Sequence, residues 1–88
     1  MESYKEKLID AAGGYSFISI TNDSSVLIEG CKQILECSEV LARVVTRQYV
    51  IEIWGSDLKL SSFNNSSVNV KGRISSLSLE RKRTGEII

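Results

Sequence analysis

The stretch YVIEIWGSDLKLSSF, residues 49–63, decides the fold that the sequence predicts. Apolar and polar side chains alternate on both sides of Gly55-Ser56-Asp57, and a period of two residues is the pattern of a β-strand with one buried face. The polar break between the two runs is typical of a turn. The pattern therefore predicts two strands, with Trp54, the only tryptophan, at the end of the first.

The same period continues along most of the chain after Gly14. Apolar pairs at i and i+2 are Ile18/Ile20, Val26/Ile28, Ala42/Val44, Ile51/Ile53, Leu58/Leu60, Val68/Val70 and Leu77/Leu79. Runs rich in Asn, Asp, Ser and Gly separate several of the pairs, as turns do. We predict an all-β domain of about seven short strands, in a meander rolled into two packed layers. A short β-solenoid is the alternative, because glycines recur at strand ends.

Two hairpins follow from the pattern. Residues 40–45 and 49–54 flank a short polar connection, and residues 58–63 are joined to 68–79 by the polar run 64–67. The last segment changes parity, since Val68 and Val70 share one face whereas Leu77 and Leu79 fall on the other. A one-residue bulge at Ser75-Ser76 would return the leucines to the core side. A corner at Gly72, where the strand passes to another sheet, is the alternative.

The chain ends are expected to differ from this β domain. Residues 3–12 are predicted to form a short helix, because Ser3 and Glu6 fit a capping box and Gly13-Gly14 would end it. We divide the chain into a helix and linker at 1–14, the β domain at 15–80 and a charged tail at 81–88.

Length and composition limit the number of domains, the size of the core and the net charge of the protein. The 88 residues make one domain with a modest core, and the formal net charge is zero. Residues 1–44 carry a charge of −3 and residues 45–88 a charge of +3. The halves either neutralise each other within one fold or help copies to associate.

No apolar run approaches the ~18 residues of a membrane span, and the N-terminus has no apolar signal core. We therefore expect a cytoplasmic protein without direct membrane insertion. In that compartment Cys31 and Cys37 are expected to be free thiols.

The sequence offers no constellation of catalytic residues. Histidine is absent, so the usual base at neutral pH is missing, and no phosphate-binding glycine motif occurs. Ser56 and Asp57 are read as turn residues rather than as a reactive pair, because a serine without a nearby base is inert. Two cysteines cannot supply the four ligands that structural zinc takes. We predict a non-enzymatic protein with no catalytic residues, no metal and no cofactor.

Two surfaces are candidates for binding. Val50 and Trp54 lie on the face opposite Ile51 and Ile53, and a hairpin that is apolar on both faces favours a homo-oligomer interface there. The candidate contacts for a polyanion are basic residues near the C-terminus, namely Lys71, Arg73, Arg81, Lys82 and Arg83. Nucleic-acid binding is the less favoured of the two, because no aromatic residue in the tail could stack on a base.

Three glycines, Gly30, Gly55 and Gly72, each follow an apolar-x-apolar-x step. A Leu-x-Leu step at Leu58 and Leu60 and a closing pair at Ile74 and Leu77 complete the pattern. With these motifs in this order over residues 17–80, the sequence resembles the YabP/YqfC family of endospore-forming bacteria.

The resemblance implies a small sporulation protein without known enzymatic activity or assigned catalytic residues. It also implies a possible partner among the sporulation membrane proteins. The three equivalent glycines are expected to mark repeated corners or bulges, where the chain needs a conformation that a Cβ would oppose.

Overall fold

Six antiparallel strands form one sheet in the order β1-β2-β6-β5-β4-β3 in the computed structural model, which describes residues 16–64 and 66–82. The strands are β1 (Phe17–Thr21), β2 (Ser25–Glu29), β3 (Cys31–Cys37), β4 (Leu41–Thr46), β5 (Tyr49–Asn64) and β6 (Ser67–Arg81). The all-β prediction is confirmed. The helix predicted over 3–12 lies outside the described residues.

The number of strands is six and not about seven, because β5 continues through the polar break that the pattern predicts to be a turn. Residues 49–54 and 58–63, expected to be two strands, belong to the single 16-residue strand β5. Pairing with β6 resumes on both sides of the polar break, so the chain bends there without leaving the sheet. Strands β3 to β6 pair in chain order, as in the predicted meander. Strand β2 then pairs with β6 and extends the sheet beyond it.

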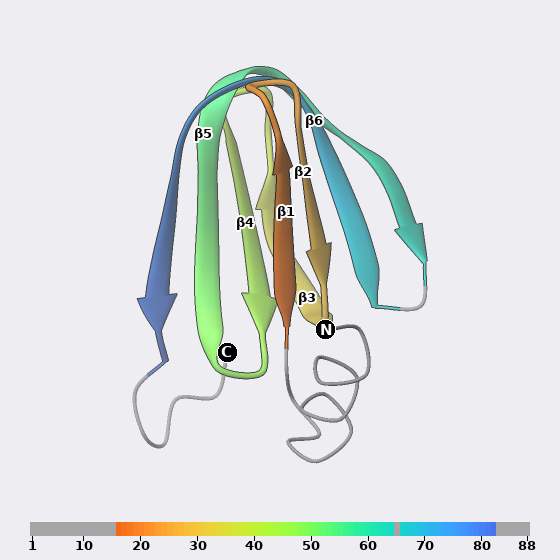
Figure 1. The fold of residues 1–88 in the computed structure, drawn as a ribbon. Coiled ribbons are helices and arrows are strands. Elements are labelled where there is room, and N and C mark those ends of the chain that lie inside the picture. Colours follow the sequence, from red (N-terminus) through yellow and green to blue (C-terminus); the bar gives the residue numbers. More distant parts are fainter. Residues whose placement is uncertain (1–15, 65, 83–88) are drawn as a thin grey trace.

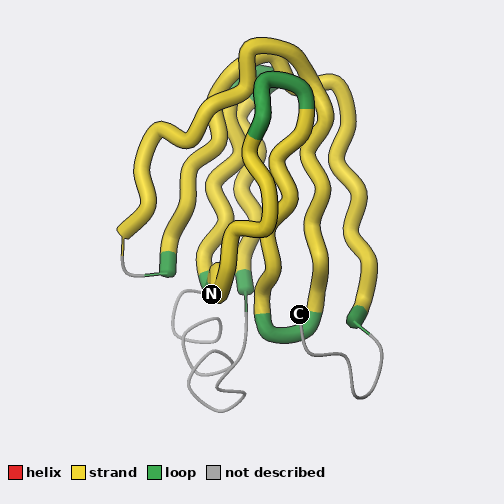
Figure 2. The backbone as a smooth tube through the Cα atoms, turned by 180° about the vertical axis from the view of Figure 1, so that it is seen from behind, coloured by secondary structure: helices red, strands yellow, loops and turns green. Residues whose placement is uncertain are grey.

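The bends in β5 and β6 fold the sheet into two layers. In Figure 1 both strands rise, arch over the top of the molecule and descend on the other side, and Figure 2 shows the same arch from behind. What we call the first layer contains β1, β2, residues 67–71 of β6 and residues 58–64 of β5. The second layer contains residues 74–81 of β6, residues 49–54 of β5, β4 and β3.

The core lies between the two layers and contains most of the alternating apolar residues that the sequence pattern singles out, whereas Ile20 and Leu79 are exposed. Its buried members are Val26, Ile28, Cys31, Ala42, Val44, Ile51, Ile53, Leu58, Val68 and Val70. Burying a side chain such as Ile51 or Ile53 contributes about 1.5–3 kcal/mol. Because these residues come from β2, β3, β4, β5 and β6, and thus from both layers, neither layer is stable without the other.

The first predicted hairpin joins β4 to β5. Thr46 is fully buried, and its Oγ1 accepts a hydrogen bond of 3.1 Å from the backbone N–H of Tyr49. Its hydroxyl lies 3.4 Å from the Tyr49 carbonyl, to which it donates. These bonds satisfy the polar groups of a threonine that has no access to water. The second predicted hairpin, between β5 and β6, is also present.

The parity change in β6 is resolved as the pattern predicts. Trp54 pairs with Ser76 and Gly55 pairs with Ile74, which leaves Ser75 as the extra residue of a bulge. The Ser75 hydroxyl donates to the Trp54 carbonyl over 3.0 Å. Leu77 and Leu79 then face Ile53 and Ile51, on the core side of the sheet. A corner at Gly72 is present as well, but β6 does not pass to another sheet there, because the strand remains in the one sheet and bends from its first layer to its second.

The bend depends on two glycines in neighbouring strands. A Cβ on Gly55 would overlap the carbonyl oxygen of Arg73, and a Cβ on Gly72 would lie 2.6 Å from the carbonyl oxygen of Asp57. Gly72 also has a φ of 145°, which side chains disfavour. Here the backbones of β5 and β6 approach more closely than any other residue allows. Gly30, with a φ of 93°, connects β2 in the first layer to β3 in the second.

Candidate functional site

The Gly55-Ser56-Asp57 break is a structural bend. Ser56 pairs with Arg73, and the next regular pair is Lys59 with Lys71, so Asp57 and Leu58 together oppose Gly72. Asp57 takes a left-handed φ of 55°, which aspartate tolerates better than most residues. Ser56 therefore serves the bend, and the described residues offer it no histidine base.

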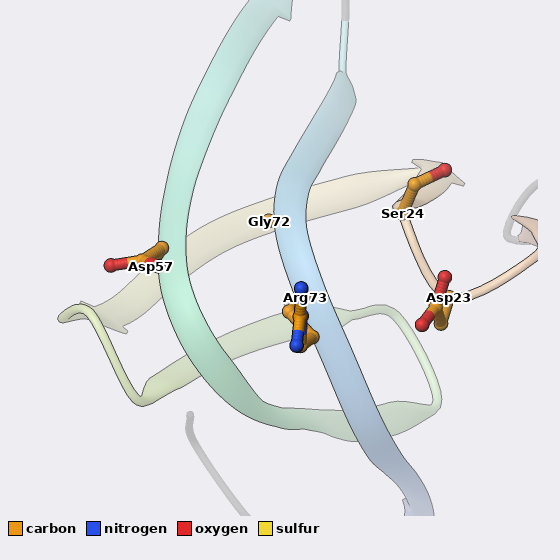
Figure 3. Close-up of a pocket in the computed structure, with 5 residues that line it drawn as sticks. All are labelled: Asp23, Ser24, Asp57, Gly72 and Arg73. Carbon is orange, nitrogen blue, oxygen red and sulfur yellow. The ribbon is translucent and has the colours of Figure 1, made fainter.

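An open hollow of about 350 Å³ lies at the bend and is lined by Asp23, Ser24, Asp57, Gly72 and Arg73. In Figure 3 the carboxylate of Asp57 points away from the other four residues. Two N–H groups of β6 are already bonded to the β1–β2 turn, from Gly72 to the Ser24 carbonyl over 3.1 Å and from Ile74 to the Asp23 carbonyl over 2.7 Å. These two hydrogen bonds hold the turn against the bend. The hollow beside them does not bring the carboxylates of Asp23 and Asp57 together.

The cysteines do not form a metal site. Cys31 is buried in the core and Cys37 is exposed, and both are free, as expected. Burial raises the pKa of the Cys31 thiol, and the hydrogen bond that its Sγ donates to the Gln33 carbonyl over 3.7 Å acts in the other direction. Within 16–64 and 66–82 the structure holds no group of three or more side chains that could ligate a metal.

The two predicted interface residues lie on the outer face of the β4–β5 hairpin, the side away from the core. Three cross-strand pairs run along it, and we call this surface the hairpin face. The pairs are Leu41–Trp54, Arg43–Glu52 and Val45–Val50. Leu41 and Val45 are buried, whereas Trp54 is 42% exposed. The surface therefore presents one large aromatic side chain, opposite an apolar residue that has little contact with water.

An ion-pair cluster separates the two apolar pairs. The Nε of Arg43 donates to Glu52 Oε2 over 2.9 Å, and its Nη1 lies 3.8 Å from Glu36 Oε1 on β3. The side chains are partly exposed, so each pair contributes at most about 1 kcal/mol. Arg43 is a cation of the acidic half of the sequence and Glu52 is an anion of the basic half, so this pair does not neutralise the net charges of the two halves.

The basic residues predicted from the sequence do not form one surface. Lys71 and Arg73 lie in β6 at the bend, whereas Arg81 is the last residue of that strand and Lys82 follows it. The guanidinium of Arg81 lies 5.2 Å from the centre of the Tyr49 ring and donates to its hydroxyl over 3.1 Å. Lys82 Nζ donates to the Thr46 carbonyl over 3.2 Å. Both residues thus hold the β4–β5 turn, and Arg83 lies outside the described residues.

The structure adds a cation that sequence reasoning missed. Lys59 of β5 pairs directly with Lys71, and Arg73 follows two residues further along β6. Like charges opposite each other destabilise a sheet. In the sequence, Lys59 and Lys71 each alternate with apolar residues, so both fall on the polar face of one predicted hairpin. Only the register of the two strands places them side by side.

Fold and surfaces together define a small two-layer β-domain. The candidate sites among its described residues are exposed faces of the sheet and not a catalytic centre. No helix in the described part of the chain is long and apolar enough to cross a membrane.

The family comparison identifies the chain. The model of the YabP family matches residues 14–86. The protein belongs to the YabP family, whose members are associated with sporulation and are not known as enzymes. Comparisons with curated proteins and with solved structures give no match.

Proposed function

We propose that this protein is a non-enzymatic accessory protein of sporulation that acts by associating with itself and with a protein partner. The observation that supports this proposal is the hairpin face, where Trp54 is 42% exposed beside the buried Leu41. Tryptophan and arginine are enriched among residues that dominate binding energy. A tryptophan that stays half in water in the free chain is well suited to be buried by another molecule.

The surroundings of Trp54 favour a protein as the binding partner. Val50 lies on the same face, and Arg43 is held between them by two carboxylates. An apolar anchor beside hydrogen-bonding ionic groups is the usual make-up of a protein interface. A second copy of the chain is the partner that we propose for this face, and a sporulation membrane protein is the further partner that family membership suggests.

Sedimentation velocity at micromolar concentrations of the full chain tests self-association. We expect a mass above that of the 9.8 kDa monomer, and Trp54→Ser should reduce it. Phe63→Ser is the matched control, because Phe63 is another exposed aromatic residue but lies away from the hairpin face. A monomer at all concentrations would refute self-association. Pull-down from sporulating cells, with wild type and Trp54→Ser as parallel baits, tests the membrane-protein partner.

A second candidate function is binding of a polyanion, and one observation favours it. Lys59 and Lys71 lie opposite each other, with Arg73 nearby, and an anion would relieve their repulsion. Asp23 and Asp57 also line the hollow beside Arg73 and oppose such binding. Titration with DNA or RNA at low salt decides this function. Lys59→Gln with Lys71→Gln should abolish a salt-sensitive affinity, and no binding by the wild type would exclude it.

A further inference from the structure

Folding of the sheet leaves four free strand edges in the described chain. They belong to β1, β3, residues 58–64 of β5 and residues 74–81 of β6. A free edge presents unpaired backbone groups that can pair with another chain, and proteins usually block such edges with bulges, lysines, proline or a short strand. The four edges differ in how well they are blocked.

Three of the edges carry such devices. The five-residue β1 is short. Strand β3 has two register shifts against β4, between Cys31 and Gln33 and between Ile34 and Glu36. The free part of β5 has a shift between Leu60 and Ser62 and carries Lys59.

Over its last six residues the edge of β6 lacks these devices, and its charged side chains, Glu80 and Arg81, stand only at the end. Residues 76–81 pair with residues 49–54 in six successive pairs without a shift, and they include neither lysine nor proline. The side chains of Ser76, Ser78 and Glu80 are exposed. This stretch is therefore the longest regular and unblocked edge in the described structure.

The alternation of backbone hydrogen bonds along β6 shows which of its N–H and C=O groups are free. The N–H of Lys82 donates to the Gln48 carbonyl over 2.8 Å. Residues of an antiparallel strand alternate between bonding to one neighbour and bonding to the other. The backbone groups of residues 76, 78 and 80 are therefore directed to β5, and those of Leu77, Leu79 and Arg81 point out from the free edge.

The same edge leaves apolar surface uncovered. Leu77 and Leu79 are directed to the core side of the sheet, opposite Ile53 and Ile51. Leu77 is half-buried, but Leu79 is 51% exposed. A strand added at this edge would cover the Leu79 side chain and bond the free backbone groups together.

We propose that residues 76–81 of β6 pair antiparallel with the same residues of a second copy, so that two second layers join into one eight-stranded sheet. The proposal rests on the self-association proposed above and adds a second contact, distinct from the hairpin face. The segment Leu77-Ser78-Leu79 reads the same in both directions, so a two-fold axis at Ser78 sets each Leu77 opposite Leu79 of the other copy.

The charges fit this register. With Ser78 at the axis, Glu80 lies opposite Ser76 and Arg81 lies opposite Ser75 of the other copy, so no like charges meet. Moving the axis to Leu79 would set Leu77 opposite Arg81 and keep only one leucine pair, between the two copies of Leu79. The free backbone groups of Leu77 and Leu79 are those that the register with Ser78 at its axis brings together. This self-complementarity favours a second copy as the occupant.

Disulfide trapping tests the register. In this arrangement Ser78 and its counterpart form a non-hydrogen-bonded pair with Cα atoms about 4.5 Å apart, within the range of a disulfide. Ser78→Cys, made in a Cys37→Ser background to remove the exposed native thiol, should form a covalent dimer on mild oxidation. Ser76→Cys in the same background is the control, because its two copies would lie about 13 Å apart. Equal trapping of both variants, or of neither, would overturn the proposal.

A charged side chain at position 79, on the core side of the sheet, tests the edge contact independently of disulfide trapping. Leu79→Lys should lower the sedimenting mass, because lysine at this position blocks edge pairing. Phe63→Lys is the matched control, since Phe63 is 55% exposed and lies on the free edge of β5. An unchanged mass of a folded Leu79→Lys variant, with an oligomeric wild type that responds to Trp54→Ser, would refute the edge contact alone. A monomeric wild type would refute both contacts.

Discussion

Trp54 and Gly55 are neighbours in β5, and they belong to regions with opposite requirements. At Gly55 the two long strands approach so closely that a methyl group would overlap the Arg73 carbonyl oxygen. At Trp54 the side chain lies on the hairpin face and is 42% exposed. The bend has no space for another side chain, whereas the hairpin face exposes a side chain that the core does not need. Folding and the proposed binding thus depend on different residues although the positions are adjacent.

The largest effect is expected at the bend. Gly55→Ala and Gly72→Ala should each lower the free energy of unfolding by about 3 kcal/mol or more, because the new Cβ meets backbone atoms of the neighbouring strand. Urea unfolding of both variants measures this cost. Unchanged midpoints would show that the bend can open, and the contrast with Trp54 would disappear.

Substitution of Leu58 tests whether the core extends up to the bend. The Leu58 side chain is 4% exposed and lies just beyond the break. Leu58→Ala should cost about 2–4 kcal/mol, the usual range for removing a buried leucine side chain. Leu60→Ala is the control and should cost less, because Leu60 is only half-buried. Equal losses would mean that the core extends evenly along β5 and has no boundary at the bend.

Trp54→Ser should separate the two regions most clearly. We expect the free energy of unfolding to change by less than about 1 kcal/mol under dilute conditions, because the side chain is largely outside the core. The sedimenting mass should fall in the same variant. A loss of stability as large as that of Gly55→Ala would instead make Trp54 part of the fold.

Contacts at the C-terminal end of β6 should contribute less to the free energy of unfolding than the bend does. Deletion of residues 81–88 removes the Arg81 contact with Tyr49 and the bond from Lys82 to Thr46, and should cost about 1 kcal/mol. Deletion of residues 83–88 keeps both contacts and is the control. Thermal unfolding of the two truncated proteins measures the difference, and equal melting temperatures would show that these contacts add nothing.

The smallest effect concerns the buried thiol. Burial raises the pKa of Cys31, so the folded state favours the protonated form. This contribution is fully present below the pKa of the unfolded thiol and is lost as pH rises through the folded value. The stability of wild type relative to Cys31→Ala should therefore decrease at alkaline pH. Urea unfolding at several alkaline pH values checks the sign, and a difference that grows with pH would contradict it.

Several features of the fold could be predicted from local patterns. The two-residue period identified the strands, and the parity change before Leu77 located the bulge at Ser75. The continuity of β5 could not be predicted in this way. Gly55-Ser56-Asp57 has turn chemistry whether the strand ends or bends, and only the pairing with β6 on both sides distinguishes the two.

The candidate surfaces were predictable to different degrees. Alternation alone placed Val50 and Trp54 on the face opposite the core. The basic surface required the register, because Lys59 and Lys71 are far apart in sequence and meet only across two strands. Arg81 and Lys82 looked like part of that surface, but their contacts with Tyr49 and Thr46 hold them at the other end of β6.

The sequence by itself determined that this is an all-β protein of the YabP type, because a two-residue period and three spaced glycines are local properties of the chain. The tertiary structure decided which edges stay free and which side chains meet across strands. Those outcomes depend on register and on the bend of β5 and β6, which arise only when segments distant in sequence pack together. The free edge of β6 therefore follows from how the sheet folds over, although each of its residues can be read in the sequence.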